Sequence, residues 1–100
     1  MDSYQNGALK HMNELQRRLV DEMLGLLSEY EGGALDLSSL AARLEAALDA
    51  GDFPESFTRP WYDCWTHIEE HAVQQDAGGQ VDKNDLQNDL EKLRAVLQTH

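Results

Sequence analysis

Four stretches of apolar residues with helical spacing, separated by segments that contain glycine, constrain this chain to an all-α fold. The first stretch repeats at steps of three and four residues, through Met12, Leu15, Leu19, Met23, Leu26 and Tyr30, with Leu27 beside them. Such steps place side chains on one face of a helix. Gly32 and Gly33 are predicted to end this helix, because glycine accepts the left-handed conformation found after many helices.

The second and fourth stretches begin with the same signal. Asp36 and Asp82 each precede an apolar run and are predicted N-caps, since their carboxylates can accept hydrogen bonds from free backbone N–H groups. The predicted buried residues are Leu37, Leu40, Leu44 and Leu48 in the second helix and Leu86, Leu90, Leu93 and Leu97 in the fourth. Gly51 is predicted to close the second helix.

The third stretch contains a proline. Its predicted apolar face is Phe57, Trp61, Trp65, Ile68 and Ala72. Proline inside a helix costs about 3 kcal/mol, so we expect either a short turn at 54–58 with a helix beginning near Pro60, or a kinked helix. Short connections favour antiparallel neighbours. The sequence therefore predicts a flexible N-terminus at 1–10 and a single domain at 11–99, an antiparallel four-helix bundle with a Pro-interrupted third helix.

The net charge of −11 limits the classes of partner. Residues 44–91 hold twelve acidic and two basic side chains, a net charge of −10. This charge repels the phosphates of nucleic acids and anionic membrane surfaces, and it attracts basic proteins. The single cysteine, Cys64, excludes an internal disulfide, and neither an export signal nor a membrane-spanning run is recognisable. A cytoplasmic location is expected.

One segment has residues that could support chemistry. His67, Glu70 and His71 match the H-x-x-E-H string of inverted zinc proteases, but only 29 residues follow, whereas those enzymes have a further acidic ligand far downstream. Cys64, His67 and His71 share one flank of the predicted helix, and sulfur with two imidazoles suits zinc, although a fourth ligand is missing. The alternative is an ordinary polar flank. We predict no catalytic residue, no metal and no cofactor.

The order of features resembles a family of small acidic helical immunity proteins encoded in bacterial polymorphic-toxin loci. The resemblance spans roughly Leu15 to Leu97, and its distinctive parts are the junction from Tyr30 through Gly32-Gly33 to Leu37 and the block Trp65-x-x-Ile68-Glu69-Glu70. The remaining parts are Leu26 to Glu29, Leu40, residues 44–48, Ala72, Asp82, Leu90, Leu93 and Leu97. Pro60 and the Cys64, His67 and His71 group are not features of that family.

The resemblance implies tight, stoichiometric binding that neutralises a cognate toxin. Toxins that act on nucleic acids or nucleotides carry basic grooves, which an acidic surface could fill. From charge and placement, the candidate partner-binding residues are Asp49, Asp52, Glu55, Tyr62, Asp63, Glu69, Glu70 and Asp76. Tyr62 lies off the apolar stripe and is either an interface anchor or packed on a neighbouring helix. A helical adaptor or dimerisation module is the alternative function.

Overall fold

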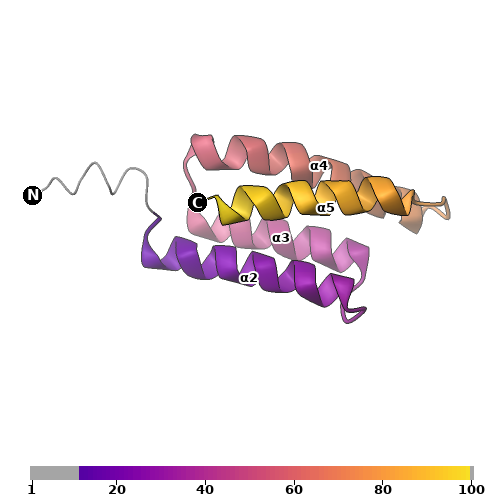
Figure 1. Cartoon of the computed structure of the whole chain (residues 1–100), viewed down its shortest axis with the longest axis horizontal. Helices are drawn as coiled ribbons and strands as arrows, with labels where there is room; N and C mark the ends of the chain where they lie inside the picture. Colours follow the sequence, from indigo (N-terminus) through magenta and orange to yellow (C-terminus); the bar gives the residue numbers. More distant parts are fainter. Residues whose placement is uncertain (1–11, 100) are drawn as a thin grey trace, which may run out of the picture.

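Four α-helices joined by short connections form the fold of residues 12–99, the part of the chain that the computed structural model describes. They are α2 (Glu14–Glu31), α3 (Leu37–Gly51), α4 (Glu55–Asp76) and α5 (Lys83–Gln98). Each runs antiparallel to the helix before it (Figure 1). Packing contacts join α2 to α3, α3 to α4, α4 to α5 and α5 back to α2. The predicted all-α antiparallel bundle is confirmed, whereas the predicted flexible segment 1–10 lies outside the described residues.

The helix ends follow the predicted signals closely. Asp36 accepts a hydrogen bond from the Ser39 backbone N–H at 2.7 Å. Asp82 caps α5 in the same way, accepting from the second and third residues of that helix. After α2, Gly33 takes the left-handed conformation at φ 87°. These local ends form as predicted because each depends only on residues within one turn.

The start of α2 differs from the prediction. Leu15, placed by its spacing on the buried face, is 53% exposed. The next residue, Gln16, is buried instead, and its side chain forms a capping box with Asn13. The Gln16 amide also donates to the Gly51 carbonyl oxygen at 2.9 Å. The first turn of α2 therefore turns a polar side chain inward, because the end of α3 supplies a backbone acceptor there.

Gly51 closes α3 as predicted, although it does not itself take the left-handed conformation. It is the last helical residue of α3, and the left-handed conformation belongs to Asp52, at φ 48° and ψ 52°. A Cβ atom on Gly51 would lie 2.3 Å from the Phe53 ring. That ring is buried and stacks on Phe57 with centroids 4.5 Å apart. Glycine at 51 therefore makes room for an aromatic ring, which a pattern of helix ends does not reveal.

Of the two alternatives predicted for Pro60, a turn followed by a new helix is wrong, and a kinked helix stays a prediction. α4 is one continuous helix from Glu55 to Asp76, and the expected turn at 54–58 belongs to it. Proline removes the hydrogen bond that its N–H would donate to the carbonyl of Ser56, four residues earlier. The loss falls near the start of α4, and the adjoining Phe57 and Trp61 are almost fully buried. Packing on both sides of the proline accordingly holds the helix together.

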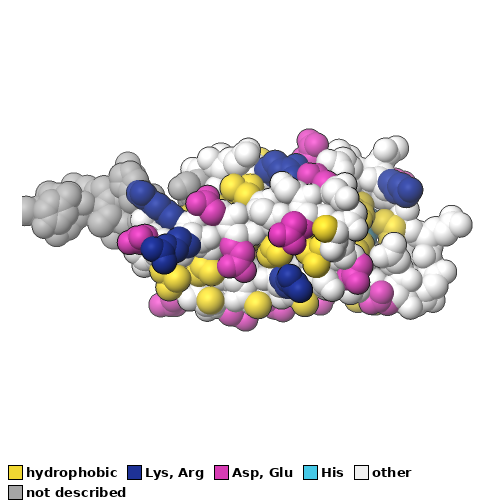
Figure 2. Space-filling model, turned by 90° about the horizontal axis from the view of Figure 1, so that it is seen from below, with side chains coloured by type: hydrophobic (Ala, Val, Ile, Leu, Met, Phe, Trp, Pro, Cys, Tyr) yellow, Lys and Arg dark blue, Asp and Glu magenta, His cyan; other side chains and the backbone are white. Residues whose placement is uncertain are grey.

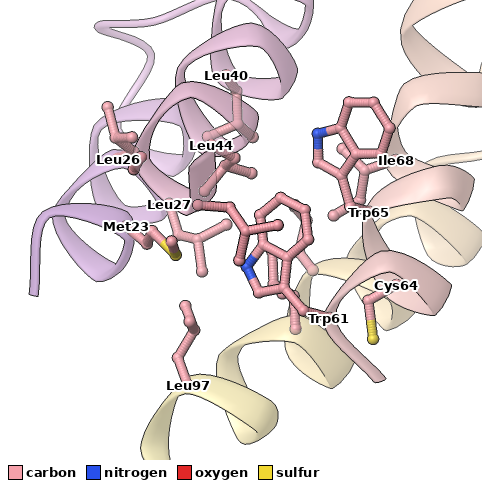
Figure 3. Close-up of a cluster of buried hydrophobic side chains, with 14 of the residues drawn as sticks. Met23, Leu26, Leu27, Leu40, Leu44, Trp61, Cys64, Trp65, Ile68 and Leu97 are labelled. Atoms are coloured by element: carbon pink, nitrogen blue, oxygen red, sulfur yellow. The ribbon is translucent and has the colours of Figure 1, made fainter. Parts of the chain in front are cut away.

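The core contains the predicted stripes of α3, α4 and α5. At its centre Trp61 and Trp65 stack with centroids 6.0 Å apart, facing side chains of α2 and α3 (Figure 3). The Trp65 indole N–H donates to the Ala41 carbonyl oxygen at 2.8 Å. The Trp61 indole N–H is fully buried and has no hydrogen-bond partner in the described part of the chain. The tryptophans thus connect α4 to the rest of the bundle, one of them at the cost of an unpaired donor.

Candidate partner-binding surface

The acidic excess concentrates on one pair of helices. Residues 36–76, which contain α3 and α4, hold nine acidic and two basic side chains, a net charge of −7. Residues 77–99 hold four acidic and three basic side chains, because Lys92 and Arg94 follow the acidic stretch directly. Acidic side chains also occur on the side of α2, where Lys and Arg lie among them (Figure 2). Of the net charge of −10 counted for residues 44–91, −7 therefore lies in residues 44–76, which end with α4, and −3 lies in residues 77–91.

A shallow hollow of about 260 Å³ lies between α3 and α4. It is lined by Ser38, Ala41, Ala42, Glu45, Trp65, Glu69, Ala72, Val73 and Asp76. Three alanines and a tryptophan supply its apolar part, and three carboxylates supply its polar part. Val73 is 61% exposed, so an apolar side chain projects into solvent beside the hollow. This combination of apolar centre and charged rim is the arrangement of many protein interfaces.

We call the line along which α3 packs on α4 the seam; its residues are Glu45, Asp49, Tyr62, Glu69 and Asp76. Tyr62 is half-buried there. Its ring makes edge-on contacts with Trp61 and Trp65, with centroids 5.1 and 5.8 Å apart. Burial, followed by the negative charges of Asp49 and Glu45, raises the pKa of the Tyr62 phenol. The tyrosine therefore packs on the tryptophans of its own helix and faces carboxylates of α3.

The eight predicted binding residues are distributed over α3, α4 and the connection between them. Four of them, Asp49, Tyr62, Glu69 and Asp76, lie along the seam of α3 and α4. The other four lie elsewhere: Asp52 and Glu55 at the α3–α4 connection, Asp63 at an exposed position of α4, and Glu70 in a hollow between α4 and α5.

Sequence reasoning missed one carboxylate of the seam. Glu45 lies in α3, in the hollow and near Tyr62. It precedes Asp49 by four residues, the spacing that places two side chains on the same face of a helix. That spacing was the available signal.

Most acidic side chains on α3 and α4 have no ionic partner. Glu45, Asp49, Asp52, Asp63, Glu69 and Glu70 form no ion pair with a cation of residues 12–99. Glu55 pairs with Arg59 on the exposed surface. Asp76 accepts a hydrogen bond from the Ser38 hydroxyl at 2.6 Å, which joins the end of α4 to the start of α3. The seam thus presents carboxylates whose charge is not compensated nearby.

The predicted metal candidates lie on the other flank of α4. The His71 Nε2 and Asp89 Oδ2 atoms are 3.0 Å apart, and the His67 Nδ1 atom is 3.9 Å from the other oxygen of Asp89. Cys64 is buried with its sulfur directed away from the tryptophans (Figure 3), and burial raises the pKa of its thiol. Across residues 12–99, no three His, Cys, Asp or Glu side chains are arranged to hold a metal ion. The histidines thus face a carboxylate of α5, and Cys64 does not complete a ligand set with them.

None of the helices in the described range combines the length and the hydrophobicity needed to cross a membrane. Comparisons with protein-family models, curated proteins and solved structures gave no match.

Proposed function

We propose that this chain is an immunity-type inhibitor, which neutralises a bacterial toxin by binding and occluding a basic surface of it through α3 and α4. The observation that carries the proposal is the uncompensated charge of the seam. Glu45 and Asp49 on α3 face Tyr62 on α4, and Glu69 lines the adjoining hollow, without a cation of residues 12–99 paired to these carboxylates.

Physical chemistry connects this surface to inhibition. Carboxylates on two rigid helices can stand where the phosphates of a nucleic acid would lie in a basic groove, and each can accept charge-assisted hydrogen bonds from Arg or Lys. Their field also accelerates encounter with a basic partner. The tryptophans beneath the seam hold its backbone in place, so little conformational freedom is lost on binding.

The adaptor or dimerisation alternative has less support. Within residues 12–99 the large apolar side chains that are exposed are Leu15 and Val73, which lie on different helices. Self-association through an apolar helix face needs a contiguous patch, and two isolated side chains do not form one. Two copies would also bring two negatively charged surfaces together.

The test uses the purified chain and the toxin domain encoded beside its gene. We expect one-to-one binding by isothermal titration calorimetry, and loss of the toxin's activity at equimolar inhibitor. Binding should weaken as salt is added, because the seam is exposed. A neighbouring gene that encodes no toxin, or a toxin that stays active with a molar excess of the chain, would contradict the proposal.

A charge-reversal pair identifies the surface. Glu45→Lys, Asp49→Lys and Glu69→Lys together change the seam, and Asp21→Lys, Glu22→Lys and Glu29→Lys change exposed positions of α2 by the same net charge. The seam variant should associate at least tenfold more slowly, within the range that electrostatic steering allows. The α2 variant should associate much less slowly. Equal slowing by both variants would show that total charge, and not the seam, controls binding.

A further inference from the structure

We infer that the hollow between α3 and α4 receives one apolar side chain of the partner, carried on a segment with Lys or Arg on both sides of it. This inference rests on the proposed function and specifies the recognition chemistry of the same surface. It begins with the floor of the hollow. Ala41 and Ala72 are almost fully buried, and Ala42 is exposed at the mouth.

The hollow is preformed. Small side chains at 41 and 72 leave space between the two helices, while the hydrogen bond from the Trp65 indole to the Ala41 carbonyl fixes one wall against the other. At the far end the Ser38 hydroxyl is bonded to Asp76. A pocket fixed in this way needs little rearrangement to bind a side chain, which favours affinity.

The exposed surroundings determine the occupant. Val73 projects into solvent beside the alanines and would gain from contact with another apolar group. Glu45 and Glu69 stand at the rim without an ion pair to any cation of the described range. They repel an anionic ligand and a second copy of this acidic chain. An apolar side chain flanked by cations would pack on the apolar floor while the cations pair with the carboxylates of the rim.

The experiment uses three synthetic probes: the capped peptides Lys-Arg-Leu-Arg-Lys, Lys-Arg-Ala-Arg-Lys and Glu-Glu-Leu-Glu-Glu. Methyl NMR titration of the full chain should show shifts at Ala42, Ala72 and Val73 with the leucine-containing basic peptide. This peptide should bind roughly fivefold more tightly than its alanine counterpart, since only leucine fills the hollow. The acidic peptide should not bind.

A variant in which a larger side chain occupies the hollow provides the control. Ala42→Trp should abolish the preference for leucine over alanine. Ala95→Trp, at an exposed position within α5, should preserve it. The peptide comparison uses the unaltered chain as well, so a variant that fails to fold leaves the test intact.

The outcomes separate this inference from the proposed function. Equal affinity of the two basic peptides, or methyl shifts confined to other residues, would overturn the hollow as a binding site while the toxin titration could still succeed. A leucine preference that Ala42→Trp removes supports the hollow even if the neighbouring toxin does not bind, and in that case the proposed function is wrong while the hollow remains a binding site.

Discussion

The two tryptophans of α4 allow a comparison of a paired and an unpaired buried donor. Trp61→Phe and Trp65→Phe each exchange an indole for a phenyl ring in the same cluster. The Trp65 N–H donates to Ala41, whereas the Trp61 N–H has no partner among residues 12–99. Trp61 belongs to the cluster of buried apolar side chains that Figure 3 shows. The two exchanges should therefore differ in their effect on stability.

The difference can be worked out from the contacts. Removing the paired donor loses a net hydrogen bond, worth about 0.5–1.5 kcal/mol, while removing an unpaired buried donor recovers a penalty of about 1–3 kcal/mol. Trp61 is fully buried and Trp65 is 8% exposed, so the cavity left at 61 is somewhat more costly and offsets part of this gain. We expect Trp65→Phe to lower the free energy of unfolding by at least about 1 kcal/mol more than Trp61→Phe.

Urea denaturation followed by circular dichroism measures the free energy of unfolding of both variants, and equal m-values would confirm that only stability changes. Each variant keeps one tryptophan, whose fluorescence provides a second probe of the same transition. The reasoning is refuted if Trp61→Phe is as destabilising as Trp65→Phe, because the unpaired N–H would then carry no penalty.

Two further predictions concern the α3–α4 connection and its seam. Gly51→Ala should lower the free energy of unfolding by about 1–3 kcal/mol, because the added methyl group clashes with Phe53. The control Asp52→Gly should be tolerated. An unchanged or raised Tm of the Gly51→Ala variant would contradict the clash. Tyr62 has a raised pKa, so its share of stability is present below its ordinary pKa and is lost as pH rises through the higher folded value. Asp49→Asn should lower the pKa of Tyr62 toward its ordinary value, although burial should keep it raised. NMR signals of the tyrosine ring measure this pKa, and Asp21→Asn is the control. A pKa that Asp49→Asn leaves unchanged would exclude the predicted charge effect.

The candidate surface could be predicted only in part. The charge count over residues 44–91 found an acidic excess, but a count over a continuous range does not distinguish the charge of α4 from that of α5. The acidic side chains of α5 are largely balanced by Lys83, Lys92 and Arg94. Tyr62 and Asp49 were recognised as separate candidates, and their proximity follows from how α3 packs on α4. Glu70 was grouped with Glu69, although one residue along a helix turns a side chain by about 100° and places it by α5.

By itself the sequence determined four amphipathic helices, most of their ends and most of the core. Asp36, Asp82 and Gly33 act within a single turn, and leucines at steps of three and four define a buried face wherever the helix packs. Tertiary structure decided that Gln16 turns inward in place of Leu15, that Gly51 accommodates Phe53, and that α4 continues through Pro60. Those outcomes depend on residues that are distant along the chain or on the packing around them. Local periodicity therefore predicts which face of a helix is buried, while only the packed structure determines what each side chain meets there.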